Sequence, residues 1–318
     1  MEYRPFQNSD PPQLLKLWHD CGLGRGAAMG FSGAAFEILV LSHLYFDRFG
    51  LILAIEDGKL AGALHAGFGC LPDESNLDYS SGVISGLMVR PEYRHHGVAQ
   101  ELLRQGEEYL RSRGAKSIQA GGAYPNDPFY VGLYGGSLLP GFLKSDPTAE
   151  TFFKQSGYEP IAEHIVFQRD LGFRNEPYDY RTMNIRRTSQ FAISEGPPKL
   201  TWWWVSRFGA FDFIRFTLQS KTQNKLLAEV YCHSMDLFAR SGDQRVVAMT
   251  GLWVNPEERG KGYAKALLLD VFRKLREEAV TRIEMQTQSD NSATIHLLSI
   301  LNCEQIDSGT VYRKISQE

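Results

Sequence analysis

The sequence contains one motif twice, at a constant distance. Residues 86–99 read Gly-Leu-Met-Val-Arg-Pro-Glu-Tyr-Arg-His-His-Gly-Val-Ala, and residues 251–264 read Gly-Leu-Trp-Val-Asn-Pro-Glu-Glu-Arg-Gly-Lys-Gly-Tyr-Ala. The two prolines are 165 residues apart (256 − 91), and the same offset relates both segments without a gap as far as residues 118 and 283. A gapless repeat of this length predicts two copies of one domain: copy one, residues 1–171, and copy two, residues 180–318.

Each repeated segment predicts a strand, a glycine-containing loop and a helix. The apolar strand runs 87–89 and 252–254 are stopped by Pro91 and Pro256, which cannot donate to a sheet ladder. Apolar residues at helical spacing follow each loop. A loop at a helix N-terminus presents unpaired backbone N–H groups, which suits a phosphate. Neither loop carries the glycine pattern of a Walker or dinucleotide-binding motif.

This loop resembles the acyl-CoA pyrophosphate loop of the GNAT acetyltransferase superfamily. The pattern Arg-x-x-Gly-x-Ala is carried by Arg94, Gly97 and Ala99 in copy one, and by Arg259, Gly262 and Ala264 in copy two. The alternative for either loop is an ordinary strand–turn–helix with a structural glycine. Two loops in register with the rest of the pattern favour the resemblance.

The resemblance implies an α/β (α+β) fold of two GNAT domains in tandem, as in mycothiol-synthase-like proteins, each with a mixed, mainly antiparallel sheet flanked by helices. It also implies that the strand ends and loops bind acetyl-CoA, the cosubstrate. The residues in copy one are Leu87, Met88, Val89, Arg94, His95, His96, Gly97, Val98 and Ala99. Those in copy two are Leu252, Trp253, Val254, Arg259, Gly260, Lys261, Gly262, Tyr263, Ala264 and Asn291.

The two copies differ in the elements around the repeat. Copy one shows the complete domain order, with a strand at 3–7, helices at 11–18 and 36–46, and a hairpin at 51–67. It also holds an insertion of about 20 residues, near 123–142, which either lines the substrate mouth or packs on the other copy. In copy two we expect strands at 202–205, 211–218 and 226–233, with the first helices reduced or missing. The alternative is a short helix within 187–195.

Both copies end like the family, with a helix, a tight turn and a last strand. We expect the turn at Gly157 in copy one, followed by a strand at 164–169, and at Asn302 in copy two, followed by a strand at 310–314. Asparagine can also adopt the left-handed conformation that this turn needs.

The residues that many family members use for proton transfer are missing. A tyrosine often stands four residues before the final glycine, but Phe153 and Leu298 occupy that place here. The fourth strands carry no carboxylate. Candidate substitutes are His65, Tyr134 and Asp127 in copy one and Glu229 in copy two, although each also fits a packing role. The general acid and base therefore stay unassigned.

Composition narrows the class of partner. Lys and Arg number 34, Asp and Glu 37, and the net charge is −3, which argues against a nucleic-acid partner. No apolar run approaches the ~20 residues of a membrane span. Four scattered cysteines indicate neither a disulfide framework nor a zinc site, so we expect a cytoplasmic protein.

The sequence thus predicts direct transfer of an acetyl group from acetyl-CoA to a primary amine of a small molecule or peptide. We expect copy one to be catalytic, because it retains the helices that build a substrate cleft. One alternative is a non-catalytic acyl-CoA sensor or pseudoenzyme. Another is transfer from a carrier other than CoA, as in relatives that use aminoacyl-tRNA. The acceptor and the oligomeric state stay open.

Overall fold

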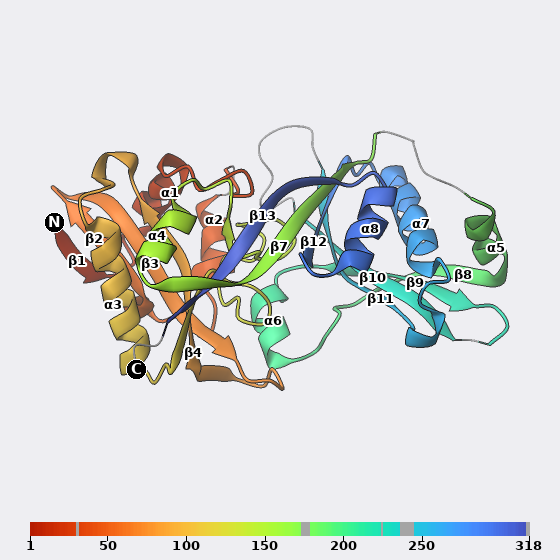
Figure 1. Cartoon of the computed structure of the whole chain (residues 1–318), viewed down its shortest axis with the longest axis horizontal. Coiled ribbons are helices and arrows are strands. Elements are labelled where there is room, and N and C mark those ends of the chain that lie inside the picture. Colours follow the sequence, from red (N-terminus) through yellow and green to blue (C-terminus); the bar gives the residue numbers. More distant parts are fainter. Residues whose placement is uncertain (30–31, 173–178, 224, 236–244, 316–318) are drawn as a thin grey trace.

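One continuous sheet runs through both copies (Figure 1). The computed structural model describes residues 1–318 except 30–31, 173–178, 224, 236–244 and 316–318. The strand order is β1-β2-β3-β4-β5-β13-β7-β12-β11-β10-β9-β8, and β6 pairs with β13. Within the described residues, only the β4–β5 and β11–β12 pairs are parallel, so the predicted mixed, mainly antiparallel α/β fold is confirmed.

Copy one has the predicted order of elements. These are β1 (Glu2–Pro5), α1 (Pro11–Asp20), α2 (Gly33–Phe36), β2 (Leu51–Glu56), β3 (Lys59–Cys70), β4 (Leu77–Val89), α3 (Val98–Ser112), β5 (Ser117–Ala120), β6 (Phe142–Leu143), α4 (Ala149–Gln155) and β7 (Tyr158–Asp170). The helix expected at 36–46 is wrong at its C-terminal end. Helix α2 continues only as the π-helical turn η1 (Glu37–Leu41), and no helix follows until the short 3₁₀ turn η2 (Arg48–Gly50).

Copy two begins with two short helices. Its elements are α5 (Tyr180–Thr188), β8 (Ser189–Glu195), α6 (Trp202–Phe208), β9 (Phe213–Ser220), β10 (Leu226–Ser234), β11 (Val246–Val254), α7 (Tyr263–Glu277), β12 (Arg282–Gln288), α8 (Ser292–Ile300) and β13 (Glu304–Lys314). The strand expected at 202–205 is wrong, because the Thr201 hydroxyl accepts from Trp204 N and starts a helix there. The alternative short helix at 187–195 is also wrong, since that segment is mainly strand β8.

The last strands of the two copies are exchanged. Strand β13 lies between β5 and β7, with Tyr312 opposite Ala120, and β7 lies between β13 and β12, with Val166 opposite Gln286. These two long strands cross the middle of the molecule in Figure 1. Each copy's fifth strand is therefore hydrogen-bonded to the other copy's last strand, and the copies cannot separate without breaking this pairing.

The two faces of the copy-one sheet have separate cores. Helix α3 covers one face with Leu102, Leu103 and Leu110, all buried against β2–β4. On the other face, α1, α2 and the insertion pack in a cluster that also contains Trp204 and Phe208 of α6. The second core is thus shared between the copies. Among the described helices, none is long and apolar enough to cross a membrane.

Candidate functional site

The two repeated loops have the same backbone. In each, a glycine with left-handed φ immediately precedes the helix: Gly97 (φ 81°) before α3 and Gly262 (φ 94°) before α7. The residue two positions earlier is also left-handed, His95 (φ 64°) in copy one and Gly260 (φ 74°) in copy two. Glycine adopts this left-handed conformation freely, whereas histidine adopts it at a cost. The copy-two loop, with Gly260 at this position, is therefore less strained than the copy-one loop, with His95.

The motif arginines brace the loops. Arg94 donates from Nε to Val89 O (3.0 Å) and from its guanidinium to Cys21 O at the end of α1. Arg259 makes the equivalent Nε contact with Val254 O, at 3.5 Å. In both copies the arginine therefore ties the loop back to the strand that precedes it.

The surroundings of the two loops differ. A Cβ placed on Gly97 would meet no atom within 4 Å, so the copy-one loop is open. A Cβ on Gly262 would lie 3.0 Å from Arg181 Cδ and 3.5 Å from Ile185 Cδ1, both on α5. An ion pair between Asp179 and Lys265 (2.8 Å) holds the start of α5 beside α7. Helix α5 thus lies against the helix end of the copy-two loop, while Gly260 and Lys261 of the same loop are exposed.

A pocket of about 300 Å³ adjoins the open loop of copy one. Six of the nine residues predicted for this copy line it: Leu87, Met88, Val89, Arg94, His95 and Ala99. His96 and Gly97 of the loop and Val98, the first residue of α3, do not line the pocket. The opposite wall is α4, where Phe152 and Phe153 stand, and Asp146 lies just before that helix. The pocket therefore lies between the loop and α4.

A small cavity of about 20 Å³ lies beside the pocket. Both are lined by Leu87 and Met88, and the small cavity also reaches Trp18, Tyr130 and Tyr134. The two tyrosines come from the insertion. The insertion thus lines this cavity, and whether it also lines the substrate mouth stays a prediction.

A β-bulge in β4 forms one wall of this inner cavity. The pairing of β3 with β4 shifts between His65 and Ala66, so that Ser85 has no direct partner, and Ser85 and Gly86 line the cavity. Ser85 is buried, and its hydroxyl has no hydrogen-bond partner among the described residues. Copy two has a register shift at the equivalent place, near Gly251 (251 − 86 = 165).

Tyr130 lies over this bulge, a position that the sequence analysis missed. A Cβ on Gly86 would be 3.3 Å from Tyr130 Cε2, and the Tyr130 hydroxyl is hydrogen-bonded to His65 Nδ1 (3.0 Å). Burial lowers the pKa of His65 to about 3 and raises the pKa of Tyr130 above its ordinary value. At neutral pH the pair is therefore an uncharged imidazole and a protonated phenol. The tyrosine-rich insertion was the only sequence signal, and it did not distinguish Tyr130 from Tyr134.

The other copy-one candidates have different surroundings. The Tyr134 hydroxyl accepts from Leu143 N (2.9 Å) and lines the inner cavity. Asp127 does not line it: its carboxylate is fully buried in an ion pair with Arg207 of α6. Asp127 is thus badly placed to accept a proton from a substrate. Phe153, which stands where many family members have a proton-donating tyrosine, packs between the rings of Phe142 and Tyr312.

The copy-two candidates are engaged with their own neighbours. Glu229 accepts from Arg215 Nη2 (2.5 Å) and Nε (2.8 Å) and from the Tyr231 hydroxyl (3.3 Å). Asn291 caps α8 by accepting from Thr294 N (3.2 Å). Neither lies near the copy-one pocket, so the predicted candidates do not converge on one site.

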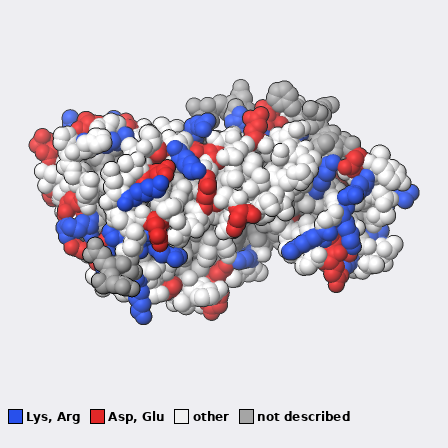
Figure 2. All heavy atoms as spheres, in the orientation of Figure 1, with Lys and Arg blue, Asp and Glu red and all other residues white. Residues whose placement is uncertain are grey.

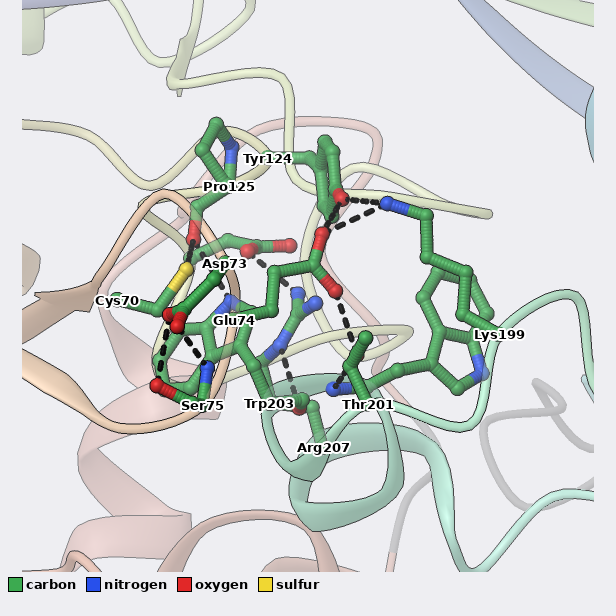
Figure 3. Close-up of polar contacts among 12 residues, drawn as sticks. Cys70, Asp73, Glu74, Ser75, Tyr124, Pro125, Lys199, Thr201, Trp203 and Arg207 are labelled. Carbon is green, nitrogen blue, oxygen red and sulfur yellow. Dashed lines mark hydrogen bonds and ion pairs between the residues drawn. The ribbon is translucent and has the colours of Figure 1, made fainter.

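The second alternative for the insertion agrees with the structure. Trp203 of α6 donates from Nε1 to Pro125 O (2.8 Å), and Arg207 of α6 pairs with Asp127 of the insertion. Figure 3 shows Tyr124 and Pro125 facing side chains of the segment that leads into and forms α6. One segment thus both lines the inner cavity and packs on copy two.

Comparison with known proteins agrees with this geometry. The sequence model described as the acetyltransferase (GNAT) family matches residues 16–134 and 180–301, which together make up most of the chain. The chain belongs to the GNAT family. Membership indicates acyl transfer as its class of reaction, and each matched segment contains one of the two loops.

Solved structures share the tandem arrangement. A tandem GNAT protein from the clavulanic acid biosynthesis pathway is 16% identical, with a TM-score of 0.67 over 100% of this chain and 99% of its own. A glucosamine N-acetyltransferase region of a fungal β-N-acetylglucosaminidase is 16% identical, with a TM-score of 0.72 over 98% of this chain, which covers 38% of that protein. A GNAT protein from Sphaerobacter thermophilus is 15% identical, with a TM-score of 0.64 over 98% of this chain and 95% of its own. At these identities the likeness shows the fold alone.

Proposed function

We propose that this protein is an N-acetyltransferase that transfers an acetyl group from acetyl-CoA to a primary amine of a small molecule or peptide, with copy one as the catalytic copy. One observation carries the proposal: the loop around Gly97 borders a pocket, and beside that pocket lies a small cavity lined by Tyr130, which is hydrogen-bonded to His65 at the β4 bulge. In copy two α5 lies against Gly262, which supports the choice of copy one.

The residues of copy one fit an acyl-CoA. Gly97 leaves open space where a Cβ would stand, so a pyrophosphate can approach the amides at the start of α3. Leu87, Met88 and Phe153 supply an apolar wall for the pantetheine arm. Asp146, which is equivalent to Asn291 of copy two (291 − 146 = 145), accepts from Thr148 N (2.9 Å) and lines the same pocket.

Acetyl-CoA supplies the acyl group as a thioester, and the chain supplies donors around it. The unpartnered Ser85 hydroxyl points to a role as donor to the thioester oxygen as negative charge develops there. The irregular pairing at the bulge leaves backbone N–H groups of β4 next to the same cavity.

Tyr130 is our candidate for the acid that protonates the departing thiolate. It is protonated at neutral pH because burial raises its pKa. With the His65 proton on Nδ1, the imidazole donates to the Tyr130 oxygen and leaves the tyrosine's own hydrogen free to point into the cavity. The same bond stabilises the phenolate that remains after the proton is given.

The distribution of charge on the surface also bears on the class of acceptor that we propose. Figure 2 shows basic and acidic side chains interspersed over the visible face, which agrees with a small-molecule or peptide amine rather than a nucleic acid. The four cysteines are free and buried, which supports a reducing, cytoplasmic location.

The second candidate function is an acyl-CoA sensor, favoured by the absence of the family's tyrosine and glutamate. Calorimetry with acetyl-CoA and an assay of CoA release against a panel of amines separate the two. Binding with turnover supports the enzyme, and binding without turnover supports the sensor. If neither acetyl-CoA nor CoA binds at millimolar concentration, both assignments fail.

A further inference from the structure

Helix α6 of copy two has two buried faces that belong to different copies. Trp204 and Phe208, one turn apart, stack on each other (4.2 Å between ring centroids) and pack on Phe213 of β9. Trp203 and Arg207, also one turn apart, face the insertion of copy one. All four side chains are buried, so the helix is held on both sides.

The face toward copy one contains a fully buried ion pair. The guanidinium of Arg207 contacts the carboxylate of Asp127, and both side chains are 0% exposed. Arg207 also donates from Nε to Trp203 O (3.3 Å) and lies over the rings of Trp203 (4.7 Å) and Tyr124 (5.5 Å). A buried charge without its partner is costly, so each residue of the pair needs the other.

A second cluster, shown in Figure 3, ties the start of α6 to copy one. Glu74, in the β3–β4 connection, accepts from Thr201 Oγ1 (2.5 Å) and pairs with Lys199 (2.7 Å). The Tyr124 hydroxyl donates to the same carboxylate. The Thr201 hydroxyl therefore donates to copy one while it accepts from Trp204 N at the start of its own helix.

The segment held in this way is the one that carries Tyr130. Asp127 precedes it by three residues, and the Tyr45 hydroxyl holds the carbonyl between them, Pro128 O, at 2.6 Å. Tyr130 itself has a left-handed backbone (φ 68°), which a non-glycine residue keeps only where its surroundings impose it. Its hydroxyl reaches His65 at the bulge.

We propose that Arg207 is a positioning residue for acyl transfer in copy one: through Asp127 it holds the insertion so that Tyr130 stays over the β4 bulge. Copy two thus has a part in the reaction of copy one without contacting its substrates. This inference rests on the proposed function for its catalytic consequence, while the positioning itself can be measured without turnover.

Hydrogen exchange tests the positioning in the full chain. In Arg207→Met, we expect exchange of the amides at 124–134 to rise about tenfold or more, because the buried Asp127 loses its partner. The control is Arg186→Met, which breaks a less buried Arg–Asp pair (2.6 Å to Asp270) within copy two and should leave that segment unchanged. Unchanged exchange at 124–134 in Arg207→Met overturns the inference.

Steady-state kinetics test the catalytic consequence. With the best amine of the panel, Arg207→Met should lower kcat about tenfold or more, since a small misplacement of a catalytic group is enough, and change the acetyl-CoA Kd less than twofold. The double variant Asp127→Leu with Arg207→Met places apolar side chains at both positions and should regain thermal stability but not kcat.

The outcomes distinguish a positioning role of Arg207 from a packing role, and they distinguish both from a failure of the proposed function. If kcat returns with stability in the double variant, the pair is a packing element and the inference is wrong. If the wild type binds acetyl-CoA but transfers nothing to any amine, the proposed function fails, and the exchange experiment still decides whether Arg207 positions the insertion.

Discussion

The two repeated loops differ in their neighbours and not in their backbones. Gly97 and Gly262 have nearly the same φ, and Arg94 and Arg259 make the same bond to their strands. The copy-one loop borders a pocket that adjoins a small cavity, whereas α5 lies against Gly262 in copy two. The motif thus specifies the backbone of the loop, and the packing around it determines what lies beside the loop.

The first helices of each copy account for this difference. In copy one, α1 ends at the loop, where Cys21 O accepts from Arg94, and the pocket stays free beside it. In copy two, α5 lies against Gly262, and α6 packs on the insertion of copy one through Trp203 and Arg207. Copy two thus contributes a helix that supports the insertion of its partner.

The largest expected effect distinguishes the loops directly. Gly97→Glu places a charge where the pyrophosphate should lie and should abolish acetyl-CoA binding and turnover, whereas Gly262→Glu should leave most activity. Gly97→Ala, which adds backbone strain without charge, is the control. Calorimetry measures the change in acetyl-CoA binding, and steady-state kinetics measure the change in kcat/KM. Loss of activity at Gly262 alone would reverse the assignment of the copies.

The next effect concerns the inner end of the copy-one pocket. Tyr130→Phe should lower kcat by about 10²-fold, the usual contribution of a placed acid, with acetyl-CoA affinity unchanged. Tyr134→Phe is matched in chemistry and burial and should have a smaller effect. The opposite ranking would make Tyr134 the acid and show that the His65 contact is structural.

A smaller effect, on acetyl-CoA affinity, should appear at the copy-two loop, where α5 lies against Gly262. Arg181→Ala removes the side chain that lies against Gly262 and should strengthen acetyl-CoA binding at copy two several-fold, without changing kcat. Titration calorimetry would show this as a second binding event or a higher stoichiometry. Binding to copy two that is already tight in the wild type would contradict the view that α5 closes this loop.

The smallest effect is a pH dependence of the contact between the copies. Burial opposes ionisation of Glu74, but bonds from Lys199, Thr201 and Tyr124 outweigh it and lower the pKa from 4.5 to about 2. Its stabilising contribution is therefore complete above pH 4.5 and is lost as the pH falls toward 2. Urea unfolding of the wild type and Glu74→Gln should differ at pH 6 and converge near pH 2. A constant difference would show that the carboxylate charge is not involved.

Much of the fold was predictable because it depends on local patterns. The repeat, the two loops, the hairpin and the left-handed turn at Asn302 (φ 54°) follow from proline, glycine and apolar spacing. The segment 202–205 was misassigned because three tryptophans and a valine favour a strand by composition. Its helical conformation depends on the Thr201 cap and on packing against both copies.

The amino-acid pattern alone predicts two GNAT copies, each with a left-handed glycine directly before a helix, since a backbone conformation is set by the residues that adopt it. The packing of distant segments shows what lies against each loop, that β7 and β13 are exchanged, and that Tyr130 meets His65. These features join segments far apart in the chain, such as Asp127 and Arg207, and no local pattern records which distant side chain will share a buried space.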